Sequence, residues 1–363
     1  MTGENRIDSV DVLRGVTIAG MIVVNDPGTW SAVYPPLLHA EWHGWTYTDT
    51  IFPFFLFVVG VSLVLSFARQ RKDGASDGVL FRRMAIRAAA LVGLGLALNF
   101  VSYLAFHKAH MRFPGVLQRI GVCVLVAGAI VLWGGVRGAA AAAAALLLGY
   151  WALMGSGPLD PQSNLAARID AAVFGPHTWK PGWDPEGLLS TLPAIATTLW
   201  GAVAGERLRS PLSPERKFTE LLAGGAAAAS MGFLWGRVFP VNKNLWTSSY
   251  ALAMAGLGAM ALALFYWAMD VRGWKRLAAP FLWLGRNAIA AFVLSSLTAI
   301  ALIAVHVEGP DGKPRPLWTA IHRTLFDRFA DPRLGSLAFA LAYLAIWIAV
   351  FGLLYRRRVF FKI

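Results

Sequence analysis

Long apolar segments separated by short polar ones run along the whole chain. A helix needs about 20 mostly apolar residues to cross ~30 Å of hydrocarbon, and ten segments come close to that requirement. Their ranges are 9–25, 48–67, 85–106, 115–134, 138–155, 187–205, 217–235, 247–268, 279–305 and 335–355. The pattern therefore predicts an all-α, polytopic integral membrane protein with about ten transmembrane helices.

The composition agrees with this prediction. Of the 363 residues, 57% are hydrophobic and 15% are charged, and the mean hydropathy is +0.55. These values exclude a soluble globular protein and an intrinsically disordered one. The single cysteine, Cys123, excludes a disulfide within the chain. We expect a single transmembrane domain over 1–363 and no soluble domain.

The net charge of +13 indicates how the chain is oriented in the membrane and does not indicate nucleic-acid binding. The basic residues lie in short clusters between apolar segments, which is the pattern of cytoplasmic loops. Ten spans place both termini on the side that carries these clusters, so we expect both termini in the cytoplasm. All seven histidines fall on the opposite, outer side of this topology.

Ionisable residues inside the spans are candidates for function, because a charge in the bilayer is costly. Asp11 and Arg14 are three residues apart and can pair along one helix face. Arg14 keeps spare donors, which suit a phosphate that enters from the cytoplasm. Arg286 and Asn287 could converge on the same ligand, although Arg286 could equally extend to the headgroups.

The outer half carries the groups that an acyl transfer requires. A neutral histidine such as His39 can accept a proton or carry the acyl group, and a carboxylate such as Asp49 can fix its tautomer. Asn25, Gln118 or Arg119 could stabilise the oxyanion. Structural roles are equally open: a helix cap for Asn25 and for Asp49, and a buried ion pair for Arg119.

Metal binding is not predicted. His39 and His43 are four residues apart, and His107 and His110 are three apart, which would suit two ligands on one helical face. However, proline precedes the first pair, glycine follows it, and no His-Glu-x-x-His motif occurs. There is also no glycine-rich phosphate loop of the P-loop or Rossmann kind.

Two outer segments, 179–187 and 239–246, combine aromatic rings with polar side chains. Such groups suit an amino sugar, although both segments also have the composition of a helix entry. The candidate substrate-binding residues in them are Trp183, Asp184, Glu186, Asn242, Lys243 and Asn244.

Several motifs occur in a fixed order along the chain. They are RIDSVDVLRG at 6–15, VN at 24–25, HAEWHGWT at 39–46, RFPGVLQR at 112–119, DPEG at 184–187, PVNKNLW at 240–246 and FFKI at 360–363. Together they resemble the heparan-alpha-glucosaminide N-acetyltransferase family. The resemblance implies a membrane enzyme that takes acetyl-CoA from the cytoplasm and acetylates the amine of a glucosamine residue on the far side.

The resemblance also implies roles for individual residues. The family histidine falls on His39 and its partner asparagine on Asn25, and the arginines near the cofactor fall on Arg6, Arg14 and Arg119. The sequence departs from the family pattern in two ways. The stretch between Asn25 and His39 is a few residues longer than in the animal enzyme. The N-terminal part and first helix of the animal enzyme have no counterpart in this sequence. Arg286 is not part of the family pattern.

These observations define one hypothesis and one rival. We expect a bacterial inner-membrane acetyltransferase with His39, Asn25 and Asp49 as catalytic residues. Its cofactor-binding residues would be Arg6, Arg14, Gln118, Arg119, Arg286 and Asn287. Its partners would be an amino-sugar acceptor and membrane lipid, without nucleic acid and without a metal, and we consider a homodimer as its assembly. The rival is an amino-sugar permease whose polar groups line a path, but the sequence has no internal repeat.

Overall fold

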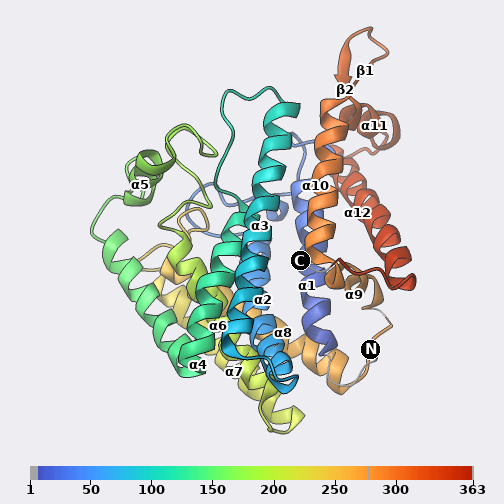
Figure 1. The fold of residues 1–363 in the computed structure, drawn as a ribbon. Helices are drawn as coiled ribbons and strands as arrows, with labels where there is room; N and C mark the ends of the chain where they lie inside the picture. The colour runs from blue at the N-terminus through green and yellow to red at the C-terminus, as the bar shows by residue number, and fades with distance from the viewer. Residues whose placement is uncertain (1–6, 277, 362–363) are drawn as a thin grey trace.

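A computed structural model describes residues 7–276 and 278–361, and almost all of its regular structure is helical (Figure 1). The helices are α1 (Asp8–Asn25), α2 (Tyr47–Lys72), α3 (Asp77–Ala105), α4 (Val116–Met154), α5 (Leu165–Phe174), α6 (Thr191–Arg209), α7 (Pro214–Trp235), α8 (Ser248–Phe265), α9 (Ala279–Arg286), α10 (Ala288–Ala304), α11 (Leu317–Phe326) and α12 (Pro332–Arg356). The shorter elements are a 3-10 turn (Pro35–Leu37), a π-helical turn (Tyr266–Val271) and two strands, β1 (His306–Glu308) and β2 (Pro314–Pro316).

Each of the ten predicted segments lies largely in helical structure. Among the described residues, five helices are long and apolar enough to cross a membrane, and six if one bent pair is counted as a single span. The protein is therefore a mostly helical chain with several candidate membrane spans. The total of about ten spans and the cytoplasmic position of the termini stay predictions.

The predicted boundary between 115–134 and 138–155 lies inside α4. Gly135 has φ 59° and ψ −164°, which interrupts the helical backbone there. Glycine is the residue that adopts a positive φ without steric cost. The 39 residues of α4 thus form two helical segments, as expected.

The segment 279–305, predicted as one helix, is broken. Helices α9 and α10 meet at an angle of 86°, because Asn287 between them has a non-helical backbone with φ −126° and ψ 34°. Close packing of α9 on α1 accompanies the bend: a Cβ added at Gly285 would lie 1.8 Å from the carbonyl oxygen of Asp11, and one at Gly15 would lie 1.8 Å from that of Phe281. The two backbones touch through these two glycines.

The loops 156–186 and 306–334, predicted to lie on the side opposite the cytoplasm and called the outer loops, contain short helices and strands that the apolar pattern did not predict. Helix α5 lies in the segment 156–186, and α11 lies in the segment 306–334 behind the antiparallel hairpin of β1 and β2. In Figure 1, α5, α11 and the hairpin all lie at the upper end of the molecule. These elements are too short to span a bilayer.

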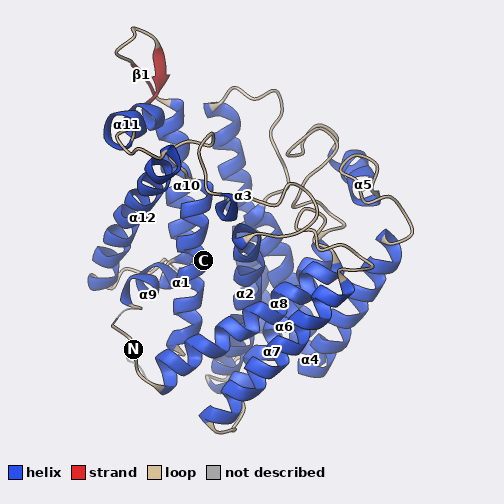
Figure 2. Ribbon diagram, turned by 180° about the vertical axis from the view of Figure 1, so that it is seen from behind, coloured by secondary structure: helices blue, strands red, loops and turns tan. Residues whose placement is uncertain are grey.

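The longer helices form two groups (Figure 2). Helices α2, α4, α6, α7 and α8 stand together on one side, and α1, α9, α10 and α12 stand on the other. Helix α1 also packs on α2, so it links the groups. Within the first group α2 and α6 approach closely, since a Cβ at Gly60 would lie 1.8 Å from the carbonyl oxygen of Thr198 and one at Gly201 would lie 1.9 Å from that of Phe57. Small residues allow such close approach between helices in membranes.

Gly60→Ala tests the contact between α2 and α6. The added methyl group has no space, so we expect the free energy of unfolding to fall by about 1–3 kcal/mol, seen as a lower melting temperature in detergent. Gly93→Ala on α3 is the control, because a Cβ there meets nothing within 4 Å. Equal melting temperatures for the two variants would contradict the packing described.

Candidate active site

His39 and Asp49 form a direct pair at the start of α2. The Nδ1 atom of His39 lies 2.6 Å from Oδ1 of Asp49, and the side chain of Asp49 is 1% exposed whereas that of His39 is 47% exposed. The second oxygen of Asp49 accepts hydrogen bonds from the backbone N–H groups of Ala40 at 3.0 Å and Thr46 at 2.9 Å. The N-cap residue of α2 is Thr46 rather than Asp49, and Asp49 completes a capping box with Thr46 from the third position of the helix. Asp49 also holds the ring of His39 through its Oδ1.

The loop that carries His39 is fastened to the segment that precedes α8. The backbone N–H of Gly44 donates to the carbonyl oxygen of Val241 at 2.7 Å, and Nδ2 of Asn242 lies 3.3 Å from Nδ1 of His43. From α8 itself, the hydroxyl of Tyr250 donates to the backbone oxygen of Asp49 at 2.6 Å. The position of His39 thus depends on contacts far away in the sequence.

Asn25 is the last residue of α1 and is exposed. Its side chain makes no capping hydrogen bond in this structure, since Asp26 is the C-cap residue. The outer ends of α1 and α2 lie side by side, because a Cβ at Gly20 would be 3.3 Å from the hydroxyl of Tyr47 and 3.1 Å from Cδ1 of Ile51. The amide of Asn25 is therefore available at the same end of the helices as His39.

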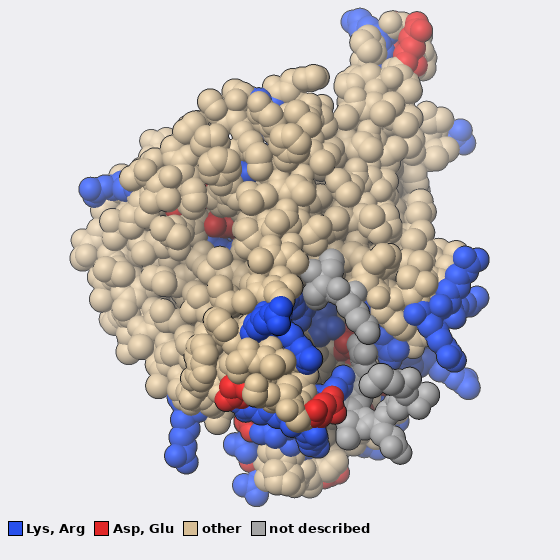
Figure 3. Space-filling view, in the orientation of Figure 1, with Lys and Arg blue, Asp and Glu red and all other residues tan. Residues whose placement is uncertain are grey.

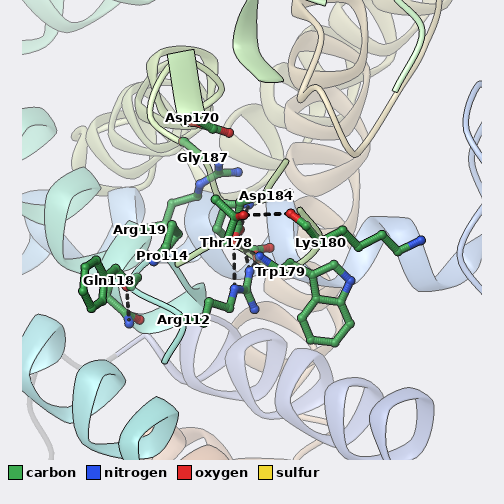
Figure 4. A network of polar contacts seen from close by, with 12 residues as sticks. Arg112, Pro114, Gln118, Arg119, Asp170, Thr178, Trp179, Lys180, Asp184 and Gly187 are labelled. Atoms are coloured by element: carbon green, nitrogen blue, oxygen red, sulfur yellow. Dashed lines mark hydrogen bonds and ion pairs between the residues drawn. The ribbon is translucent and has the colours of Figure 1, made fainter. Parts of the chain in front are cut away.

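A charged network holds the outer segment 179–187 (Figure 4). The guanidinium of Arg112 donates to Asp184 through Nε at 2.7 Å and through Nη2 at 2.6 Å, and Nη2 also donates to Glu186 at 2.5 Å. Arg112 also lies over the ring of Trp179, 5.1 Å from its centroid. Asp184 and Glu186 were expected to bind substrate. Their carboxylates instead form ion pairs with Arg112, which was not among the predicted site residues.

The remaining candidates of the outer segments differ in their surroundings. Trp183 packs on Trp42 of the His39 loop, with 5.8 Å between ring centroids. Asn242 is fully buried and accepts the backbone N–H of Leu245 at 2.8 Å, so its role here is structural. Burial lowers the pKa of Lys243, while the negative charges of Glu186 and Asp49 oppose this shift.

Lys243 and Asn244 are both partly buried. Neither side chain has a hydrogen-bond partner among the described residues.

Gln118 and Arg119 lie on α4 toward the outer network. The amide of Gln118 donates to the backbone oxygen of Phe113 at 2.9 Å. Arg119 is 2% exposed and donates to the carbonyl oxygen of Gly187 at 3.1 Å and to the hydroxyl of Ser190 at 2.5 Å. Its Nε and Nη1 atoms are buried and have no hydrogen-bond partner among the described residues, so they remain available to a ligand.

A chain of aromatic contacts connects Arg119 to the His39 pair. Its guanidinium lies 5.1 Å from the ring centroid of Trp246. Trp246 packs edge-to-face on Tyr250 at 5.4 Å, and Tyr250 bonds to the backbone of Asp49. Trp246 also has a φ of 50°, a strained value for a bulky residue.

The helix ends that are predicted to face the cytoplasm, called the inner ends, enclose a basic hollow. Arg14 donates to Asp11 at 2.8 Å, as predicted, and to the hydroxyl of Ser62 at 2.5 Å. It lines a cavity of about 610 Å³ and a smaller one of about 230 Å³. The basic residues that line these cavities with it are Arg69, Lys72, Arg87, Arg209, Lys217 and Arg286. Figure 3 shows Lys and Arg gathered around a hollow at this end.

Arg286 and Asn287 border the smaller of these cavities. Arg286 lies 3.8 Å from a carboxylate oxygen of Asp11 and 4.9 Å from the ring centroid of Tyr355. Asn287 accepts the backbone N–H of Phe361 at 2.9 Å and donates to the carbonyl oxygen of Val359 at 3.3 Å. Its amide is thus used to hold the C-terminal segment, whereas Arg286 still faces the cavity with Arg14. Arg6 lies outside the described residues.

The structure therefore sorts the candidates into two sites. His39 and Asp49 form a pair at the start of α2, and Asn25 ends α1 at the same end of the two helices. Arg119 reaches this pair through Trp246 and Tyr250. Arg14, Arg286 and Asn287 come together at the inner ends, away from Gln118. Arg112 was not among the predicted site residues. Neither were four basic residues near helix ends, Arg69, Lys72, Arg209 and Lys217. Their basic clusters were visible, but they were interpreted only as signals of orientation.

The histidine pairs do not form a metal centre here. His39 faces Asp49 whereas His43 faces Asn242, so the two rings have different partners. Across residues 7–276 and 278–361 there is no group of three or more His, Cys, Asp or Glu side chains that could hold a metal ion.

Arg112→Gln tests the outer network. Burial alone would raise the pKa of Glu186, but the nearby cations Arg112, Lys243 and Arg119 outweigh it and hold this pKa below its usual value. Removing Arg112 leaves two buried carboxylates without their cation, so we expect a loss of about 3–5 kcal/mol in unfolding free energy.

The pH dependence of this stabilisation has a definite sign. Because the folded pKa of Glu186 is lowered, its contribution is present above the unfolded pKa of about 4.3 and is lost as the pH falls through the folded value. Melting curves at several pH values measure both effects. Asp77→Asn is the control, since it breaks an exposed pair with Arg71 worth about 0–1 kcal/mol. A wild-type-like Arg112→Gln variant would contradict the role of the network.

Sequence comparisons relate the chain to known proteins. The family described as heparan-alpha-glucosaminide N-acetyltransferase, catalytic, matches residues 6–237. The human heparan-alpha-glucosaminide N-acetyltransferase is 27% identical over 367 aligned positions, which cover 79% of this chain and 52% of that protein. The mouse protein of the same name is 25% identical, covering 80% of this chain and 53% of its own. The chain spans about half the length of these curated relatives.

The matched range contains the His39–Asp49 pair, Asn25, Arg14 and the network of Arg112. It covers well over half of the chain, and it confirms the resemblance that the ordered motifs carry. The chain belongs to the heparan-alpha-glucosaminide N-acetyltransferase catalytic family.

Proposed function

We propose that this protein is a membrane-embedded N-acetyltransferase that moves an acetyl group from cytoplasmic acetyl-CoA to the amine of a glucosamine-type sugar on the opposite side of the membrane. One observation carries the proposal: the His39–Asp49 pair and the basic hollow lie at opposite ends of the same two helices, α1 and α2. Arg14 and Asn25 are eleven positions apart on α1, which corresponds to about 16 Å along the helix.

The basic hollow has the chemistry to hold the phosphates of the cofactor. Phosphate groups are polyanionic and are bound by arginine forks and lysine ammonium groups. Arg14, Arg69 and Lys217 line the larger cavity, and Arg87 and Arg286 line the smaller one. The uncharged arm of acetyl-CoA would then extend between the helices and present its thioester to the outer pair.

His39 would handle the proton in the transfer step. Its Nδ1 faces Asp49, so the proton of a neutral ring resides there and Nε2 is left as the base. The neutral amine of the acceptor attacks the thioester carbonyl carbon, and Nε2 removes the proton from the ammonium group that forms. The carbon–sulfur bond then breaks, and the imidazolium returns that proton to the departing sulfur, so that coenzyme A leaves as the thiol. In the alternative, Nε2 itself attacks, and an acetyl-histidine passes the group to the amine.

Two further groups would stabilise the negative charge that develops on the carbonyl oxygen. Asn25 offers an amide without a hydrogen-bond partner among the described residues. Arg119 offers the N–H groups of its two buried, unpartnered nitrogens, Nε and Nη1. Donors fixed before the reaction contribute strongly in a site of low dielectric constant.

The acceptor sugar would approach from the outer segments. Trp183, Lys243 and Asn244 are the candidates there whose side chains are partly exposed and have no hydrogen-bond partner among the described residues. Asp184 and Glu186 would act through Arg112 by holding the segment in place.

The amino-sugar permease is not favoured, because the family to which the chain belongs is one of acetyltransferases. We propose the bacterial inner membrane as its location.

His39→Ala tests the chemistry. We expect kcat to fall at least ~100-fold because the proton acceptor or acetyl carrier is lost, while acetyl-CoA binding measured by calorimetry stays within a few-fold of the wild type. His43→Ala, whose ring contacts Asn242 instead, is the neighbouring control. An equal loss in both variants would contradict the assignment of His39. Incubation with labelled acetyl-CoA alone separates the two routes, since only an acetyl-histidine labels the protein.

Sidedness of the two substrates is the second test. In sealed proteoliposomes of one orientation, acetylation of an impermeant amino sugar should require acetyl-CoA on the face that bears the termini and acceptor on the other face. Orientation is read from Ser76→Cys and Ser163→Cys in a Cys123→Ala background, where an impermeant reagent outside the cell should label only the second. If both substrates were needed on one face, transfer across the membrane would be wrong although acetyl transfer itself could still occur.

A further inference from the structure

A separate cavity of about 530 Å³ lies at the outer end of the molecule, between the loop that follows α1 and helix α11. The loop contributes Thr29, Trp30 and Ser31, and α11 contributes His322 and Arg323. None of these residues belongs to the catalytic pair or to the basic hollow. A cavity of this size matches the pockets that hold small ligands.

Hydrogen bonds hold the loop that lines this cavity against α11 and α12. The N–H of Thr29 donates to the hydroxyl of Ser336 at 3.0 Å, and that hydroxyl donates to the carbonyl oxygen of Thr29 at 3.0 Å. The indole N–H of Trp318 donates to the carbonyl oxygen of Pro27 at 3.1 Å. Gly28 also packs directly on His322, since a Cβ there would lie 2.2 Å from its ring. The wall is therefore formed before any ligand arrives.

The lining combines an open aromatic face with hydrogen-bonding groups. Trp30 is 64% exposed. The hydroxyls of Thr29 and Ser31 lie 2.9 Å apart. His322 is 5% exposed and its Nε2 has no hydrogen-bond partner among the described residues. A pyranose ring suits such a lining, because its C–H face can stack on an indole while its hydroxyls bond to the polar groups.

The cavity also lies next to the candidate active site along the chain. Pro27, which lines it, follows Asn25 by two residues, so their Cα atoms are at most ~7 Å apart. The same loop continues to His39. A glycan whose amine lies at Asn25 would therefore reach this cavity with the adjoining sugar.

We propose that this cavity is a second sugar subsite, which binds the pyranose unit linked to the glucosamine that is acetylated. Trp30 stacks on that unit, and Thr29, Ser31, His322 and Arg323 supply hydrogen bonds to its hydroxyl groups. The inference rests on the proposed function, since it names the acceptor as an oligosaccharide rather than a free amino sugar. It assigns Trp30 a role in acceptor affinity, not in the chemical step.

Trp30→Ala tests the subsite with two acceptors, glucosamine and the disaccharide of two β-1,4-linked glucosamines. In the wild type we expect a lower KM for the disaccharide. The variant should raise that KM by about tenfold, which is the scale of one lost aromatic contact. Its kcat and its kinetics with glucosamine should stay unchanged, which also shows that it folds. Trp274→Ala is the control, because Trp274 is 67% exposed and does not line this cavity.

Other results would overturn the proposal. Unchanged disaccharide kinetics in Trp30→Ala would mean that Trp30 contacts only lipid at the interface, and equal losses on both acceptors would mean that it acts through the catalytic site. Binding of N,N′-diacetylchitobiose is measured by saturation-transfer NMR and does not depend on turnover. If the wild type acetylates neither acceptor, the proposed function fails, and loss of this NMR signal in Trp30→Ala still decides whether the cavity binds sugar.

Discussion

A buried carboxylate, that of Asp49, fixes the geometry of the outer site. Its two oxygens hold the ring of His39 and the backbone N–H groups of Ala40 and Thr46, and its own backbone oxygen accepts from Tyr250. A buried carboxylate without these partners would be costly. The hydrogen bonds to the Asp49 carboxylate therefore fix three features together. They are the start of α2, the path of the loop before it and the direction of the imidazole ring.

The pattern of the sequence predicted the helical segments well because the signal is local. Apolar runs located the helices, and the spacing of Asp11 and Arg14 predicted their ion pair. Asp49 was recognised as a partner of His39 and as a residue at the start of α2. Each of these features depends on residues within one or two turns or on a short loop, where the spacing in the sequence limits the geometry.

Features that depend on distant pairing were not visible. Arg112 and Asp184 are 72 residues apart, so nothing in either segment shows that the carboxylate is already occupied. The break between α9 and α10 accompanies the close contact of Gly285 with α1. The two polar residues at the break, Arg286 and Asn287, were interpreted as ligand groups inside one helix rather than as the end of a helix. Helix α11 was missed because its apolar residues form one stripe, which an average over a membrane-length window hides.

The glycine contacts limit how this protein can move. A slide of α1 by one helical turn would bring Asp11 or Ala19 to the place of Gly15, where 1.8 Å separates the site of a Cβ from the backbone of Phe281. The same holds for α2 against α6 at Gly60. These crossings therefore hold the register of α1 against α9 and of α2 against α6. In the proposed transfer, the donor and the acceptor would meet within helices that keep this register.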